Sequence, residues 1–204
     1  MDRLRNLARS NIQIEIAVFV FLIFAFQYSA FGESDSVDLR FERTTIFTPL
    51  GTPVEAMIYN ETISPVQISQ LNDQWIAYSQ YQDAEKVSDS TYTYNCHGYT
   101  WYMSEGGQRR LHIENPQPYL EDGSYEIIEE HEVVAGDKVL YGNGVHSAVI
   151  ADEPGWVVSK WGNGPLMRHR LRDVPLEFGQ DLELTFYRKV SLPAPPANLR
   201  IVVQ

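Results

Sequence analysis

The chain has 204 residues, a formal net charge of −11 and a single cysteine. An acidic chain lacks the basic face that nucleic-acid phosphates require, so we expect no nucleic-acid partner. One cysteine cannot form an intramolecular disulfide, and the fold must therefore rest on a hydrophobic core, for which this length suffices.

Residues 1–32 are typical of a targeting segment. A positive head of three arginines precedes an unbroken apolar run from Ile16 to Phe26, and small residues follow at Ala30 and Gly32. The run is short for a bilayer core of about 30 Å. We therefore expect an exported protein, periplasmic, wall-bound or secreted. It would contact a membrane only if this segment were retained as an N-terminal anchor.

Residues 33–90 are expected to form an N-terminal extension that packs on a catalytic core. Alternating apolar and polar residues predict a strand at 37–42, and Val54 to Tyr59 predict another. Apolar residues at three-to-four spacing predict a helix over 68–84, with a start near Ser64-Pro65. Ser88 to Ser90 is predicted to be a loop.

Residues 91–190 are predicted to form the core. Asn95 stands where a helix N-cap would stand, so a short helix is expected over 96–104, ending at Gly106-Gly107. Residues 108–132 are predicted to be a loop that contains one weak strand, because Pro116, Pro118 and Gly123 interrupt regular structure there. Glycine-rich turns then separate expected strands at 133–134, 138–141, 146–151, 156–161 and 182–188, which indicates an α+β fold. Residues 191–204 form a Pro-rich tail.

Cys96 is the leading candidate for a nucleophile, with an inert buried thiol as the alternative. Because Cys96 would follow a helix cap, the unsatisfied N–H groups at the helix start would stabilise the thiolate and lower the pKa of the thiol. His146 opens a strand after the Gly142-Asn143-Gly144 turn, and it is the expected general base. His97 would point away from its neighbour Cys96, and His169, between two arginines, reads as solvated surface or a substrate contact.

A third group should orient the imidazole of His146. Ser159 is favoured, and Lys160, Asn163 or a backbone carbonyl remain open. The expected substrate-binding residues lie near this pair: Tyr94 or Asn95 as an oxyanion contact beside the Cys96 N–H, together with Lys160 and Trp161. No His or Cys pair has a convincing metal-ligand spacing, so neither a metal nor a cofactor is expected.

Three segments together resemble a known family. They are Asn95-Cys96-His97-Gly98-Tyr99-Thr100-Trp101, the Gly136-Asp137 block, and His146-Ser147-Ala148-Val149-Ile150. This combination resembles the papain-like cell-wall cysteine hydrolases of the NlpC and CHAP kind, over roughly 91–188. The resemblance implies a papain-like core in which an N-terminal helix carries the cysteine and packs on an antiparallel sheet of about five strands. The family's third position usually holds His, Asn, Gln or Glu, and this chain departs from that pattern.

The function expected from these features is an exported thiol hydrolase that forms an acyl-enzyme on Cys96, with His146 as base. By the resemblance, its substrate would be an amide in peptidoglycan stem peptides or another peptide. An acyltransferase or deamidase would use the same pair. A different class of protein, a non-catalytic module that binds the wall or a partner, would keep Cys96 inert. The third hypothesis, a membrane-tethered structural protein, would need the leader to stay attached. Oligomeric state is not indicated.

Overall fold

The computed structural model of this chain describes residues 38–78, 83–179 and 181–191. The expected leader at 1–32 lies outside the described residues, as does the tail beyond 191. Within the part that is described, no helix is both long and apolar enough to span a membrane.

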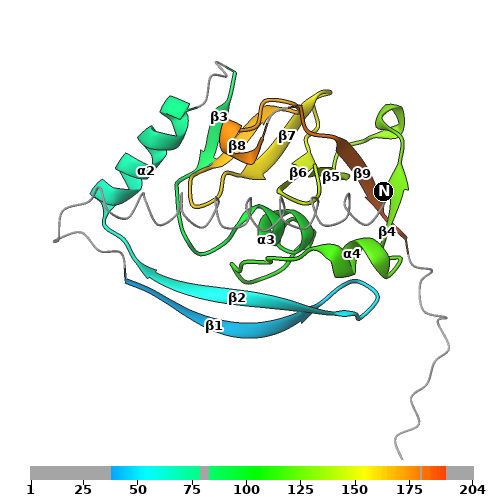
Figure 1. Ribbon diagram of the computed structural model, residues 1–204, viewed down its shortest axis with the longest axis horizontal. Coiled ribbons are helices and arrows are strands. Elements are labelled where there is room, and N and C mark those ends of the chain that lie inside the picture. Colours follow the sequence, from blue (N-terminus) through cyan, green and yellow to red (C-terminus); the bar gives the residue numbers. More distant parts are fainter. Residues whose placement is uncertain (1–37, 79–82, 180, 192–204) are drawn as a thin grey trace, which may run out of the picture. The chain divides into compact units, whose positions relative to one another are not determined.

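A seven-stranded, wholly antiparallel sheet forms the centre of the described chain, as Figure 1 shows. From edge to edge the strands are β3 (Glu85–Ser88), β8 (Leu166–Arg170), β7 (Trp156–Lys160), β6 (His146–Ile150), β5 (Lys138–Tyr141), β9 (Leu184–Lys189) and β4 (Tyr125–Ile128). The α+β class is confirmed, whereas the expected number of about five strands was too small. Val133 and Val134, expected as a strand, lie outside these strands.

The strand register assigns side chains to the two faces of the sheet. In the β5–β6 pair, Leu140 is opposite Ser147, and Tyr141 is opposite His146. Because side chains alternate along a strand, each opposed pair shares a face, and the two pairs lie on different faces. Leu140 packs in one apolar core with Trp101, whereas Tyr141 packs in a second core. We call these the Leu140 face and the Tyr141 face.

Helix α3 (Cys96–Trp101) packs on the Leu140 face, where the ring of Trp101 contacts that of Tyr187 at a centroid distance of 5.8 Å. The 3-10 turn η2 (Met103–Glu105) extends it to Gly106, whose φ of 92° is the left-handed conformation expected at a helix stop. Three further short helices are α4 (Gln117–Glu121), η3 (Glu130–Glu132) and η4 (Leu176–Phe178).

Helix α2 (Pro65–Tyr78) begins at the expected start near Ser64-Pro65, whereas residues 83 and 84, expected to be its end, are not helical. Ser64 and Gln67 form reciprocal side-chain to backbone hydrogen bonds, a capping arrangement that fixes this start. Trp75 of α2 stacks on Phe178 with ring centroids 6.2 Å apart, and its indole N–H donates to Asn163. Phe178 packs against the core of the Tyr141 face, so Trp75 adds a further aromatic layer there.

The first two described strands, β1 (Asp38–Phe47) and β2 (Pro53–Thr62), form a separate two-stranded ribbon (Figure 1). Reciprocal backbone hydrogen bonds between Met57 and His112 tie this ribbon to the segment after η2. β3, which follows the expected helix end at 84 and overlaps the expected loop only at Ser88, pairs with β8 at the edge of the main sheet. Residues 85–88, expected as part of an extension, therefore contribute a strand to that sheet.

Candidate functional site

Cys96 is the first residue of α3, and Asn95 caps that helix as expected. The Asn95 Oδ1 accepts the backbone N–H of Gly98 at 2.8 Å. The same amide also bonds the backbone of Ile113, with Nδ2 donating to its carbonyl at 2.8 Å and Oδ1 accepting its N–H at 3.2 Å. Because both ends of the amide are engaged, Asn95 fixes the start of α3 and with it the position of the cysteine. One of its two Nδ2 hydrogens is used by the Ile113 carbonyl, and its role as an oxyanion contact stays a prediction.

Gly98 lets α3 lie directly against the chain at Leu111. A Cβ atom at position 98 would stand 1.9 Å from the Leu111 carbonyl oxygen, which no side chain tolerates. The asparagine cap and this close contact together fix the first turn of the helix, and with it the position of the Cys96 sulfur.

The Cys96 sulfur lies beside the start of β6. β6 pairs with β7 at Val149 with Val158 and at Ile150 with Val157, toward the other end of β6. At the start of β6, the backbone N–H of Ser147 faces the sulfur, as does that of His97. Cys96 is 6% exposed, and burial outweighs these N–H groups and raises its pKa to about 11. The expected lowering of the thiol pKa is not found in this buried state.

His97 holds the start of β6 against α3. Its Nε2 lies 3.0 Å from the Gly144 carbonyl oxygen, and its Nδ1 lies 2.8 Å from the Ser147 hydroxyl. A carbonyl only accepts, so Nε2 carries the proton and the Ser147 hydroxyl donates to Nδ1. Burial lowers the pKa of His97 to about 4, which keeps this bonding pattern at neutral pH. His97 is therefore a positioning residue for the strand that carries His146.

His146 lies on the Tyr141 face, fully buried, with its ring stacked on Phe178 at a centroid distance of 4.3 Å. Neither ring nitrogen has a hydrogen-bond partner in the described part of the chain. The structure therefore does not join His146 to Cys96 by a hydrogen bond. Burial, together with nearby His169 and His97, holds the pKa of His146 well below its usual value, so the imidazole is neutral.

Ser159 bonds His169 and leaves His146 without the expected orienting contact. The Ser159 hydroxyl lies 2.7 Å from His169 Nε2, while Nδ1 of that ring donates to the Arg170 carbonyl at 2.9 Å. His169 itself was expected on the surface, but it is fully buried, because the alternation along β8 turns it inward. Burial lowers the pKa of His169 to about 4.

Lys160 is fully buried on the opposite side of β7 from Ser159, with its ammonium bonded to backbone. Its Nζ donates to three carbonyl oxygens, those of Thr91 at 2.9 Å, Gly162 at 2.7 Å and Gly164 at 2.5 Å. Burial lowers its pKa to about 7, and a negative charge on nearby Cys96, when that thiol is ionised, opposes this change. Lys160, which was expected to contact the substrate, is therefore an internal cation whose N–H donors all bond backbone carbonyls, and it interacts electrostatically with Cys96.

The remaining expected substrate-binding residues are also internal. Tyr94 is 3% exposed, its hydroxyl lies 3.3 Å from the Ser88 hydroxyl, and the Lys160 ammonium lies 5.0 Å from its ring centroid. Trp161 is fully buried. Within the described residues, no three His, Cys, Asp or Glu side chains gather in a way that could hold a metal ion.

Sequence reasoning missed Ser147 as the partner of His97, and it expected Lys160 at the site as a substrate contact and not as an internal cation near the sulfur. The alternation of side chains along β6 was a usable signal. Ser147 and His146 are neighbours on this strand, so only one of them can face α3. Comparison with known proteins adds nothing to these assignments, because no family model, curated protein or solved structure matches the chain.

Proposed function

We propose that the chain is an exported, papain-like thiol hydrolase that cleaves an amide bond through an acyl-enzyme on Cys96, with His146 as the general base. Peptidoglycan stem peptides are the proposed substrate. The observation that carries the proposal is the position of the sulfur, which faces the backbone N–H groups of His97 and of Ser147, the residue that follows His146.

Covalent geometry limits the distance between the Cys96 sulfur and the Cα atom of His146. The Ser147 nitrogen that faces the sulfur is two bonds, or about 2.4 Å, from the His146 Cα. The sulfur is therefore within about 7 Å of that Cα, since a hydrogen bond to sulfur spans up to about 4 Å. The imidazole packs on the Tyr141 face, whereas α3 packs on the Leu140 face, so the proposed proton transfer requires the start of β6 to rearrange until the imidazole reaches the thiol. Such a rearrangement breaks the contact with Phe178 but no hydrogen bond of the imidazole to a described residue.

The chemistry then follows from proton transfer between these two groups. The neutral imidazole of His146 takes the thiol proton, and the resulting opposite charges favour each other, which raises the pKa of His146 and lowers that of Cys96. The thiolate attacks the amide carbonyl and forms a carbon–sulfur bond. The carbon–nitrogen bond breaks as the imidazolium returns the proton to the leaving amine, and water hydrolyses the thioester.

A non-catalytic binding module is the second candidate, and burial favours it. Cys96 is 6% exposed and His146 is fully buried, so neither group meets solvent in the described state. In this second candidate, both groups stabilise the fold, and a wall peptide binds elsewhere on the surface.

Digestion of purified peptidoglycan separates the two candidates. Wild type should release new peptide fragments detectable by mass spectrometry, Cys96→Ala should release none, and His146→Gln should be slower by about 100-fold or more. The exposed His131→Gln is the matched control and should retain wild-type activity. Equal digestion by wild type and Cys96→Ala would refute the proposal. Binding of wild type to peptidoglycan without any product would favour the binding module.

A further inference from the structure

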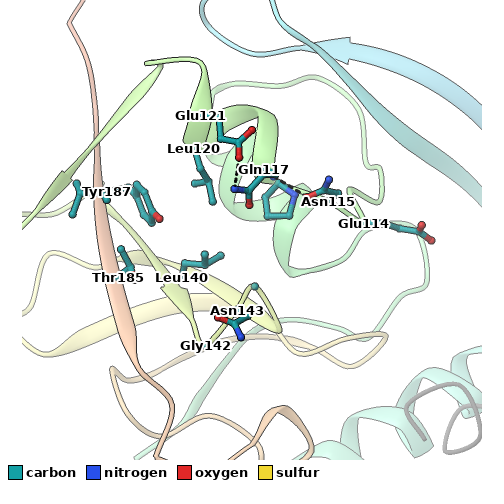
Figure 2. Close-up of a pocket in the computed structure, with 13 residues that line it drawn as sticks. Glu114, Asn115, Gln117, Leu120, Glu121, Leu140, Gly142, Asn143, Thr185 and Tyr187 are labelled. Atoms are coloured by element: carbon teal, nitrogen blue, oxygen red, sulfur yellow. Dashed lines mark hydrogen bonds between the residues drawn. The ribbon is translucent and has the colours of Figure 1, made fainter. Parts of the chain in front are cut away.

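A groove of about 500 Å³ opens on the Leu140 face, between α4 and the turn that joins β5 to β6 (Figure 2). Its apolar surface comes from Leu120 of α4, Leu140 of β5 and Tyr187 of β9. Figure 2 shows these three side chains around the same space. The volume falls in the range of about 300–1,000 Å³ that is usual for ligand sites.

The charged residues that line this groove are both acidic, Glu114 and Glu121. Both are exposed, and neither forms an ion pair among the residues that the structure describes. Glu121 accepts one hydrogen bond, from the Gln117 side-chain amide at 2.8 Å. The lining contains no lysine or arginine. The groove therefore combines an apolar floor with a negative rim that no neighbouring cation neutralises.

The groove reaches the candidate site through the β5–β6 turn. Gly144 lines the groove, and its carbonyl oxygen accepts the Nε2–H of His97, the residue next to Cys96. The groove and α3 also share the Leu140 face of the sheet. A chain lying in the groove would therefore run toward the start of α3.

We infer that this groove binds a peptide chain that carries an ammonium or guanidinium group. The cation would interact with the acidic rim to which Glu121 and Glu114 belong, while the aliphatic part of its side chain would pack on Leu140 and Tyr187. That this peptide is the substrate of Cys96 rests on the proposed function. The binding itself does not, since none of these groove residues takes part in the chemistry.

Fluorescence anisotropy with labelled alanine-based peptides tests the inference on the full chain. One peptide carries a central lysine, a second Nε-acetyl-lysine and a third glutamate. Wild type and Cys96→Ala should both bind the lysine peptide about fivefold or more tightly than the other two, as expected for two partly exposed charge contacts. This preference should weaken in 0.5 M salt, because the carboxylates are exposed.

The Glu114→Gln/Glu121→Gln double variant should lose the preference for lysine. The double variant Glu55→Gln/Glu177→Gln, with the same change in net charge at exposed positions outside the groove, should keep it. The inference is overturned if no peptide binds, if the three peptides bind equally, or if the two double variants behave alike. It is also overturned if the groove variant changes self-association instead of peptide binding. Because Cys96→Ala is included, loss of hydrolysis alone does not affect the result.

Discussion

Three buried histidines should make the stability of this protein fall steeply in mild acid. His97, His146 and His169 are each at most 4% exposed, and burial lowers the pKa of each below the ordinary value of 6.5. In the unfolded chain these imidazoles take up protons near pH 6.5, whereas in the folded protein His97 and His169 exclude them until about pH 4 and the pKa of His146 is held well below 6.5. Stability is therefore complete above pH 6.5 and is lost as the pH falls toward 4.

The size of the effect follows from the number of protons. Each excluded proton lowers the free energy of unfolding by about 1.4 kcal/mol per pH unit, so these three histidines give a slope of about 4 kcal/mol per unit. His112, whose pKa burial also lowers to about 4, adds to this slope. A domain of this size is stable by about 5–15 kcal/mol. Acid unfolding is therefore expected between pH 6 and 4. Carboxylates with a lowered pKa, such as Asp89 and Asp122, lose their contribution only below their ordinary value of 3.8.

Urea unfolding followed by circular dichroism at pH 7.5, 6.5 and 5.5 measures this slope. His169→Gln can still accept a hydrogen bond from the Ser159 hydroxyl, but it should reduce the slope of the free energy of unfolding against pH by the contribution of about one proton. The substitution His131→Gln, at an exposed position, should leave the slope unchanged. A free energy of unfolding that stays flat from pH 7.5 to 5.5 would refute the reasoning. So would a decline that begins only below pH 4.5, because it would come from carboxylates.

Three substitutions test the packing of the site by urea unfolding. Asn95→Ala loses the helix cap and both contacts to Ile113, and it should cost about 2–3 kcal/mol; a cost below 0.5 would contradict the capping role. Gly98→Ala forces its new Cβ onto the Leu111 carbonyl and should cost about 3 kcal/mol; wild-type stability would show that the close contact is wrong. Lys160→Met leaves three buried carbonyls without a donor and should cost about 3–5 kcal/mol; a neutral result would contradict the internal-cation assignment.

The central strands could be predicted from sequence because local signals agree there. β5 and β6 are bounded by Gly142 and Gly144, whose positive φ angles suit a tight turn, and their apolar runs match the observed bounds closely. β8 was missed because Arg168-His169-Arg170 looked like solvated surface. In the structure both arginines lie over the Trp156 ring, at 4.0 and 4.3 Å, while His169 points inward.

Helix α4 was missed for a different reason. Pro116 and Pro118 were treated as breakers, yet Pro118 stands in the first turn of the helix, where its missing N–H breaks no intrahelical bond. The rule that proline interrupts a helix does not hold in the first turn, and the prediction ignored this exception. The helix matters for function because it supplies one wall of the groove.

The candidate site was only partly predictable, because its contacts depend on which face of the sheet each residue occupies. The cap at Asn95 is a local feature and was predicted correctly. That Ser147 faces α3 while His146 packs on Phe178 follows from strand register, which the sequence does not contain. Of the three carbonyls around Lys160, those of Gly162 and Gly164 belong to the turn just after it, and only that of Thr91 comes from a segment distant in sequence, whose approach could not be anticipated.

The central claim, that Cys96 is a nucleophile served by His146, is tested most directly by acylation with p-nitrophenyl acetate followed by mass spectrometry. The account predicts one acetyl group per chain, located on the Cys96 peptide, formed faster than on a short cysteine peptide and slowed about 100-fold or more by His146→Gln. Acetylation at the rate of the free peptide, or at a rate that His146→Gln leaves unchanged, would contradict it.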